Sequence, residues 1–217
     1  MCGIAGVAGF SKGTTVSREQ ILAMCSVMEH RGPDDDGIGI AENVGLGMRR
    51  LSIIDVAGSK QPIFNEDRSV RTVFNGEIYN FRELRSELTR KGHQFRTSGD
   101  TETIVHAYEE YGPDFPNHLN GMFAIALHDS RARKLYLVRD HLGIKPLYYS
   151  RTDDCLVWGS EVKVILASGL VQPELSVDAI NQFLTWEYVP GSGTLMSNVH
   201  KLEPGQMLSL DLTTGRA

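Results

Sequence analysis

Short apolar runs recur along the chain at lengths typical of β-strands. They predict strands at Ile4–Val7, Val44–Met48, Val70–Phe74, Phe123–His128, Lys134–Arg139, Leu147–Tyr149, Cys155–Trp158 and Gln206–Leu210. Many of these runs are apolar almost throughout, whereas a strand with one solvated face alternates apolar and polar residues. The pattern therefore predicts strands that are covered on both faces.

Helix-start signals precede the amphipathic stretches between these runs. Ser17 with Gln20 forms a capping-box pattern, and Asn80 with Glu83 forms a second one, whose helix ends at Gly92. Further helices are predicted from about Thr101 to Gly112, over Glu161–Ala167, and over Val177–Leu184 after a Ser176 cap. Strands grouped before and after helix pairs favour layered α+β or α/β packing over a regular βαβ alternation.

Composition narrows the classes of function. The 217 residues, 41% hydrophobic and 23% charged, are typical of one large globular domain, or of one domain plus a fragment. A net charge of −5 without a dense basic run argues against a nucleic-acid partner. No apolar run approaches the roughly 20 residues that span a bilayer, and no basic segment of a secretory signal opens the chain. We therefore expect a cytoplasmic protein with no membrane partner.

The cysteines are Cys2, Cys25 and Cys155, and the first could carry chemistry. No CxxC motif and no Cys/His pair at metal-ligand spacing is present, so neither a disulfide framework nor a metal site is expected. Removal of Met1 by an aminopeptidase would leave Cys2 at the N-terminus. An α-amine titrates at about 7.7–8.0 and can help to deprotonate a thiol on the same residue. A cysteine can also occupy position 2 by chance.

Other residues could bind a substrate beside such a nucleophile. Asn75, Gly76 and Glu77 directly follow a predicted strand, and an Asn amide next to a Gly N–H can donate to an oxyanion, although Asn-Gly also forms hairpin turns. Arg50 offers a bidentate partner for a carboxylate, although most arginines are solvated or structural. Asp100 could accept from an ammonium or simply favour a helix N-terminus. A protein that binds an α-amino acid needs a cation for the α-carboxylate and an acidic group for the α-ammonium. These residues together therefore indicate such a substrate more specifically than any one of them does alone.

Six ordered motifs carry a specific resemblance. They are Met1-Cys2-Gly3-Ile4-Ala5-Gly6, His30-Arg31-Gly32-Pro33-Asp34, Arg50-Leu51-Ser52-Ile53-Ile54-Asp55, Asn75-Gly76-Glu77-Ile78-Tyr79-Asn80, Ser98-Gly99-Asp100-Thr101-Glu102 and Gly143-Ile144-Lys145-Pro146-Leu147-Tyr148-Tyr149. Over essentially the whole chain, 1–217, they closely resemble the N-terminal glutaminase domain of glutamine-hydrolysing asparagine synthetases. That domain is a class II glutamine amidotransferase and an N-terminal-nucleophile hydrolase. Other class II types usually carry His-Asn-Gly where this chain has Phe74-Asn75-Gly76.

The resemblance implies an α+β fold, a four-layer αββα sandwich, and hydrolysis of L-glutamine through a γ-glutamyl thioester. It implies Cys2 as the nucleophile, the freed α-amine as the base, and Asn75 with Gly76 as the oxyanion hole. Arg50 would hold the α-carboxylate of glutamine, and Asp100 with Glu77 its α-ammonium. The lining of the pocket would include Leu51, Ser52, Ile53 and Ile54. No cofactor or metal is expected for this step.

The chain departs from the family pattern in two places. Asp140-His141-Leu142-Gly143 stands where Asp-Arg-Phe-Gly is common, and we interpret His141 as a surface or packing residue because the α-amine already supplies a base. No ATP-binding synthetase domain and no Ser-Gly-Gly phosphate loop is present, so ATP and Mg²⁺ are expected only with that missing C-terminal domain. A strand-like segment, 208–212, followed by a turn at 213–216, suggests a cut at a domain boundary.

Three hypotheses remain open. The chain is an active glutaminase that supplies ammonia to a C-terminal or separate synthetase domain, for asparagine synthesis. Alternatively, it is a non-catalytic glutamine-binding or regulatory module, the state that a retained Met1 would produce. In the third, it is a standalone amidotransferase subunit that serves a different acyl acceptor. A homodimer is compatible with each of them.

Overall fold

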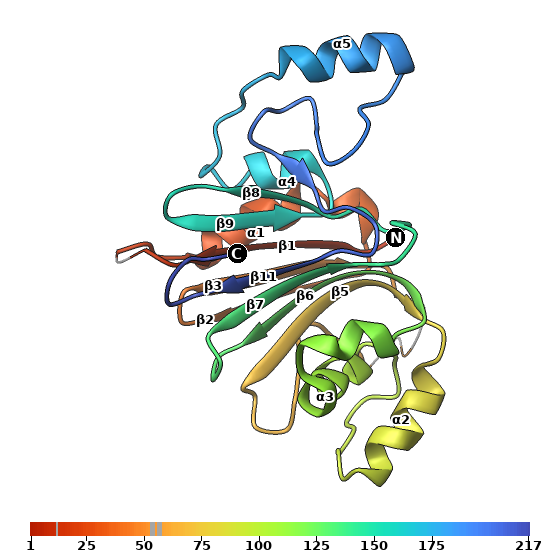
Figure 1. Ribbon diagram of the computed structural model, residues 1–217. Coiled ribbons are helices and arrows are strands. Elements are labelled where there is room, and N and C mark those ends of the chain that lie inside the picture. Colours follow the sequence, from red (N-terminus) through yellow and green to blue (C-terminus); the bar gives the residue numbers. More distant parts are fainter. Residues whose placement is uncertain (12, 53–54, 56–57) are drawn as a thin grey trace.

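The computed structural model describes residues 1–11, 13–52, 55 and 58–217, which form two antiparallel sheets (Figure 1). Sheet A has the strand order β10-β8-β9-β1-β3-β2, and sheet B has the order β11-β7-β6-β5-β4. The strands of sheet A are β1 (Gly3–Gly9), β2 (Asp35–Ala41), β3 (Val44–Arg50), β8 (Tyr148–Arg151), β9 (Cys155–Gly159) and β10 (His200–Lys201). Those of sheet B are β4 (Ile63–Phe64), β5 (Val70–Ile78), β6 (Gly121–Asp129), β7 (Lys134–Arg139) and β11 (Met207–Asp211).

Helices cover the outer face of each sheet, so the chain forms four layers. Helices α1 (Arg18–Ser26) and α4 (Val162–Leu166) pack on sheet A, and α2 (Phe81–Arg90) and α3 (Glu102–Tyr111) pack on sheet B. Short 3₁₀ segments, η1 (Glu29–Arg31) and η2 (Gly112–His118), follow α1 and α3. One apolar core lies between the sheets and one lies under each helical layer. The predicted αββα sandwich is therefore confirmed.

Strand β1 shows how the layers are specified. All seven of its residues are buried. Because successive side chains of a strand point to opposite faces, Ile4 and Ala8 pack in the core between the sheets, whereas Ala5 and Val7 pack under α1 and α4. The prediction of strands covered on both faces is confirmed here.

The apolar runs located most strands but missed three short or glycine-rich ones, β2, β4 and β10. Strand β2 has the sequence DDGIGIA, which lacks both an apolar run and a regular alternation. Its glycines are needed for close packing, since a Cβ at Gly37 would collide with the Gln61 carbonyl and one at Gly39 would crowd Pro62. The requirement comes from a segment distant in sequence, so no local pattern predicts it.

The predicted helix starts are correct to within a residue or two, but both predicted capping boxes form differently. The Ser17 hydroxyl accepts from Gln20 N at 3.1 Å, as predicted, whereas the Gln20 side chain donates to Ser168 O at 2.9 Å rather than back to Ser17. Asn80 makes no capping hydrogen bond to α2. Its amide instead donates to His118 O and accepts from Asn120 N, each at 2.9 Å. In both cases a side chain that the local capping motif would use forms a hydrogen bond with a residue distant in the sequence instead.

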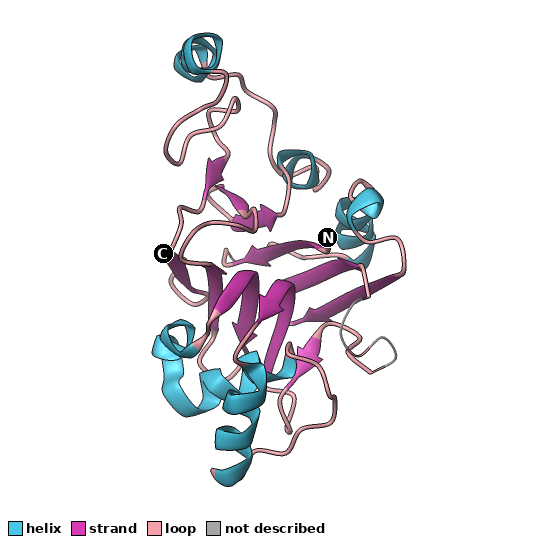
Figure 2. Ribbon diagram, turned by 90° about the vertical axis from the view of Figure 1, so that its right-hand side faces the viewer, coloured by secondary structure: helices cyan, strands magenta, loops and turns pink. Residues whose placement is uncertain are grey.

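Helix α5 (Val177–Trp186) begins at the predicted Ser176 cap and stands away from the sandwich (Figure 2). Several of its apolar side chains are exposed, among them Leu184 at 76% and Trp186 at 62%. Within the described ranges, no helix combines the length and the apolar character needed to cross a membrane. The predicted C-terminal strand is confirmed as β11, which pairs with β7.

Candidate active site

Cys2 lies directly before β1, a central strand of sheet A. By the alternation of the strand its side chain faces the same way as Ile4, toward sheet B, and it packs against the core between the sheets. The thiol is held at Leu51, whose N–H donates to Cys2 Sγ at 3.4 Å and whose carbonyl lies 3.6 Å from the same sulfur. Arg31 Nε donates to the Cys2 carbonyl at 2.9 Å. The residue is therefore fixed by both its backbone and its side chain.

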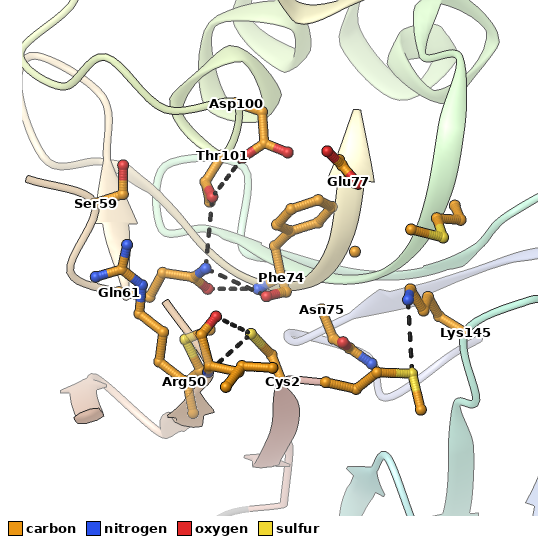
Figure 3. Close-up of a pocket in the computed structure, with 15 residues that line it drawn as sticks. Cys2, Arg50, Ser59, Gln61, Phe74, Asn75, Glu77, Asp100, Thr101 and Lys145 are labelled. Atoms are coloured by element: carbon orange, nitrogen blue, oxygen red, sulfur yellow. Dashed lines mark hydrogen bonds between the residues drawn. The ribbon is translucent and has the colours of Figure 1, made fainter. Parts of the chain in front are cut away.

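A cavity of about 120 Å³, suited to a small molecule, opens beside this thiol where the two sheets meet (Figure 3). The predicted site residues that line it are Cys2, Arg50, Leu51, Asn75, Gly76, Glu77 and Asp100. The structure thus brings together residues from five of the six motifs, counting Lys145 of the sixth. Ser52 is not among the lining residues, and its N–H donates to Asp34 Oδ2 at 2.8 Å instead. The predicted residues Ile53 and Ile54 lie outside the described residues.

Asn75, Gly76 and Glu77 do not follow the strand as predicted but belong to it, because β5 continues through them to Ile78. Asn75 pairs with Ala124 of β6 in the ladder. Its side chain therefore points into the layer between the sheets, toward the face that Cys2 occupies. The side chain is 1% exposed, and its Nδ2 has no hydrogen-bond partner among the described residues. A buried amide donor without an acceptor is costly unless a ligand supplies one.

The backbone of Gly76 faces the open edge of β5. At the end of the β5–β6 ladder, Tyr79 N donates to Asn120 O at 2.7 Å. In an antiparallel ladder the hydrogen-bonding direction alternates along the strand. The backbone groups of Phe74, Gly76 and Ile78 are therefore directed away from β6, toward the edge that β4 covers only at Arg71 and Thr72.

Side chains satisfy the two neighbours of Gly76 on that edge. Gln61 Oε1 accepts from Phe74 N at 2.7 Å, and Gln61 Nε2 donates to Phe74 O at 3.2 Å. Asp100 Oδ2 accepts from Ile78 N at 3.0 Å. Between them the Gly76 N–H is left facing the cavity, beside the Asn75 amide. Position 76 admits only glycine without rearrangement, because a Cβ would collide with the Met122 carbonyl and with Phe123 Cα.

Opposite charges reach the cavity from opposite sheets. Arg50, at the end of β3 in sheet A, is 5% exposed and donates from Nη2 to Asp55 O at 2.8 Å. Asp100 enters from the sheet B side, is 6% exposed, and lies near the Glu77 carboxylate. Burial raises the pKa of Asp100, and the negative charge of Glu77 raises it further. A ligand ammonium beside these two carboxylates would relieve both effects.

Sequence reasoning missed several residues of the cavity. Lys145 belongs to a motif that carries the resemblance but had no assigned role; it is 6% exposed, and its Nζ lies 3.7 Å from Met1 Sδ. Asp140 positions this lysine by accepting from Lys145 N at 3.0 Å and from Phe123 N at 3.1 Å. The remaining lining residues that were not predicted are Met1, Met48, Ser59, Gln61, Phe74, Thr101 and Met122. No motif or spacing in the sequence marks Gln61. His141 is exposed and does not line the cavity, as its interpretation as a surface residue requires.

The chain is similar over almost its whole length to proteins of known type. Residues 1–216 match the family described as "Glutamine amidotransferase domain". The chain is 40% identical over 216 residues to "Asparagine synthetase [glutamine-hydrolyzing] 1" of Bacillus subtilis (strain 168), covering 97% of this chain and 33% of that protein. It is 43% identical over 166 residues to "Asparagine synthetase [glutamine-hydrolyzing] 2" of Oryza sativa subsp. japonica, covering 76% and 28%. The chain thus spans about a third of the length of these relatives.

Solved structures share the fold at low sequence identity. A glutamine phosphoribosylpyrophosphate amidotransferase from B. subtilis, complexed with ADP and GMP, superposes with a TM-score of 0.67 at 19% identity, covering 97% of this chain and 47% of that one. A structure described as the allosteric regulatory enzyme of purine biosynthesis gives a TM-score of 0.70 at 18% identity, with the same coverage. At these identities the likeness concerns the fold alone.

Proposed function

The chain belongs to the glutamine amidotransferase domain family, as its motifs predict, and on that premise we propose that it hydrolyses L-glutamine to L-glutamate and ammonia. One observation carries the proposal. The thiol of Cys2, from sheet A, and the donors of Asn75 and Gly76, from sheet B, line one cavity. A nucleophile and two oxyanion donors are the groups that acyl transfer requires.

Recognition of glutamine rests on the charges at the two ends of the cavity. Arg50 binds the α-carboxylate, and Asp100 with Glu77 binds the α-ammonium. This orientation directs the side-chain amide of glutamine toward Cys2. The Asn75 Nδ2, which lacks a protein acceptor among the described residues, and the Gly76 N–H then donate to the amide oxygen.

The reaction proceeds in two covalent steps. After removal of Met1, the α-amine of Cys2 takes the thiol proton, and the sulfur attacks the side-chain amide carbon of glutamine. A C–S bond forms, the C–N bond breaks, and the amine-held proton leaves with ammonia. Water then attacks the γ-glutamyl thioester, the C–S bond breaks, and glutamate and the free thiol are released. Negative charge develops on the amide oxygen in both steps, where the Asn75 and Gly76 donors stabilise it.

Every group in these steps belongs to the protein, to glutamine or to water, so the proposed reaction uses no cofactor and no metal. Met1 lines the cavity and contacts Lys145. Its removal would therefore both free the base and enlarge the space beside the thiol. A chain that retains Met1 would have an acylated Cys2 amine and would correspond to the glutamine-binding module without catalysis.

The acceptor of the ammonia is proposed from the relatives. They are named glutamine-hydrolysing asparagine synthetases and are about three times as long as the matched region. We therefore propose that this domain supplies ammonia to a synthetase domain that amidates aspartate with the aid of ATP and Mg²⁺. The glutamine cavity itself is compatible with a different acyl acceptor, because the acceptor does not enter it.

The proposal is tested by intact mass spectrometry before and after incubation with the glutamine analogue 6-diazo-5-oxo-norleucine. The first spectrum reports whether Met1 is removed. We expect the processed chain to gain one adduct, located at Cys2 by peptide mapping, and excess glutamine to block it. An Arg50→Lys variant is the matched control for specificity, since it retains the thiol and the charge but loses bidentate carboxylate binding, and should label more slowly.

The other outcomes separate the hypotheses. A processed chain that binds glutamine but never labels would support the binding module over the enzyme. A chain that keeps Met1 and gains an adduct after aminopeptidase treatment would show that processing is the missing step. Labelling of Cys25 or Cys155 in place of Cys2 would contradict the assigned nucleophile.

A further inference from the structure

A second cluster of ionisable side chains lies on the helical side of sheet B, apart from the glutamine cavity. It contains Glu66, in the turn between β4 and β5, His93, just after α2, and His106 and Glu109 on α3. None of these four residues lines the cavity at Cys2. One ligand atom from each of the four lies within 4.8 Å of the others.

The distances in this cluster approach those of a tetrahedral metal site. His106 Nδ1 lies 3.2 Å from Glu109 Oε2 and 3.5 Å from Glu66 Oε2. His93 Nδ1 lies 3.7 Å from Glu109 Oε2 and 3.8 Å from Glu66 Oε1. Zn²⁺ with nitrogen and oxygen ligands at their usual bond lengths holds neighbouring ligand atoms about 3.3–3.4 Å apart. The four histidine–carboxylate distances are within about half an ångström of that value, and all four ligand atoms lie within 4.8 Å of one another.

Each imidazole also has a carboxylate beside its second nitrogen. Glu102 Oε1 lies 3.7 Å from His106 Nε2, and Glu110 Oε2 lies 3.7 Å from His93 Nε2. A metal-ligating histidine commonly directs its other N–H to a carboxylate, which fixes the tautomer and the ring orientation. With the proton on Nε2, both Nδ1 atoms present lone pairs to the centre of the cluster. His106 Nε2 is buried and, within the described residues, lies beyond hydrogen-bond distance of any partner.

The charges around the two imidazoles are predominantly negative. The carboxylates that face them belong to Glu66, Glu102, Glu109 and Glu110. Lys91 Nζ offsets part of this charge at Glu110, at 2.8 Å, whereas the Arg96 guanidinium donates to the backbone oxygen of Glu66. Carboxylates therefore outnumber the nearby cations, and a dication at the centre would reduce the mutual repulsion.

We propose that His93, His106, Glu66 and Glu109 bind a first-row divalent cation, with Zn²⁺ as its best representative. Two imidazoles and two carboxylates form a donor set that suits Zn²⁺ better than Mg²⁺ or Ca²⁺, which select oxygen ligands. The His106 side chain is fully buried, whereas those of Glu66 and Glu109 are 34% and 25% exposed, so a cation can enter from the surface.

The site has a structural role. It joins α3 to the β4–β5 turn and to the segment that follows α2; α3 packs against both α2 and β4 (Figure 1). Helix α3 begins two residues after Asp100, the residue that faces the glutamine ammonium. The cation would therefore hold the outer helical layer and touch no reacting atom. The proposal does not depend on glutamine hydrolysis.

The experiment is a titration of the chelator-treated full chain with Zn²⁺ in a calorimeter, repeated in a Cys2→Ala background because the Cys2 thiol can bind zinc by itself. We expect one tight site per chain in both backgrounds. His93→Gln and Glu66→Gln, at partly exposed positions, should each weaken the site by at least about tenfold. His141→Gln, an exposed histidine outside the cluster, is the matched control and should bind as the parent does.

Cobalt identifies the ligands independently. Co²⁺ bound to this donor set should give the visible absorption of a tetrahedral nitrogen and oxygen site without a thiolate charge-transfer band, and His93→Gln should abolish it. Far-UV circular dichroism establishes that each variant is folded. The proposal is overturned if the Cys2→Ala chain binds no zinc, if folded His93→Gln and Glu66→Gln bind as tightly as His141→Gln, or if cobalt bound to the Cys2→Ala chain shows thiolate ligation.

Discussion

The Cys2 cavity and the His93/His106 cluster both adjoin sheet B, yet they differ in the charges that they bring together. In the cavity, Arg50 and Lys145 face Asp100 and Glu77 across one small space, so both signs of charge are present. Burial raises the pKa of Asp100 there. In the cluster, burial alone would lower the pKa of His106, but the surrounding carboxylates raise it to about 9. The cavity is complementary to a zwitterion, whereas the cluster is complementary to a cation.

The two sites also differ in how they hold their polar groups. Beside the thiol, the cavity offers a backbone N–H and a neutral amide, since Gln61 and Asp100 accept from the N–H groups of Phe74 and Ile78 and leave the Gly76 N–H and the Asn75 amide facing the cavity. The cluster relies on ionisable side chains from a turn, a helix end and a helix face. Fixed neutral donors such as those in the cavity can stabilise a negative charge that develops only in the transition state. The carboxylates of the cluster are charged at all times and therefore attract a cation that stays bound.

The largest expected effect isolates the nucleophile. Cys2→Ala should reduce glutamine hydrolysis by more than about 10⁴-fold, because Cys2 supplies the one thiol among the described residues that line the cavity. It should leave zinc binding at the cluster unchanged. Ammonia release and zinc stoichiometry are measured on the same preparation. Turnover within tenfold of the parent would remove Cys2 from its assigned role.

The next effect tests the oxyanion donors. Asn75→Ala should lower kcat by about 10²–10³-fold while changing KM far less, because the amide acts on charge that develops in the transition state. Steady-state kinetics with glutamine measure both parameters. Asn117→Ala, at an exposed position in η2, is the matched control and should be unchanged. A rise in KM at constant kcat would instead make Asn75 a ground-state binding residue.

Removal of the proposed cation from the His93/His106 cluster should lower the free energy of unfolding and leave the rate of glutamine hydrolysis unchanged. At a free Zn²⁺ concentration of 100 times its Kd, the parent should gain about 2.7 kcal/mol in the free energy of unfolding, and a chelator should abolish the gain. His93→Gln should show no such difference. Urea unfolding with and without chelator measures it, alongside kcat, which should stay the same. A fall in kcat on chelation at unchanged stability would place the cation in the reaction instead.

The smallest effect concerns pH and Asp100. Its carboxyl must be ionised to bind the glutamine ammonium, and burial raises its pKa above the ordinary value. As pH falls through this raised pKa, the carboxyl becomes neutral, and KM should rise by up to about tenfold per pH unit. Asp100→Asn should have a high KM that varies less over the same range. Equal pH dependence in the two proteins would exclude Asp100 as the titrating group.

Local sequence patterns predicted the four layers well, but they predicted less well which side chains contact one another. Apolar runs located β1, β3, β5, β6, β7, β8, β9 and β11, because a strand that is covered on both faces has apolar residues at consecutive positions. The same approach missed β2, whose glycines are set by contact with Gln61 and Pro62. It also predicted capping by Asn80, whose amide instead joins η2 to the start of β6. Distant partners decided each of these cases.

The glutamine cavity was predictable to the extent that its residues lie in contiguous motifs. Cys2, Arg50, Asn75 and Asp100 were all identified before their positions in space were known, and all of them line the cavity. The conformation around Asn75 was not predicted, because an Asn-Gly pair fits a turn as well as a strand edge. The His93/His106 cluster was not predicted, because the sequence has no CxxC motif and no Cys/His pair at metal-ligand spacing. Its four residues come from a turn, a helix end and a helix face that only the fold brings together.

The sequence by itself determined the family and the four-layer class, and it marked Cys2, Arg50, Asn75 and Asp100 as candidate site residues. These properties depend on residue type and on patterns within short segments. The tertiary structure alone decided that the Gly76 N–H faces a cavity, that Gln61 occupies the neighbouring edge of β5, and that two histidines meet two glutamates above α3. The physical reason is that such contacts join segments distant in the chain, and strand pairing and helix packing set their geometry.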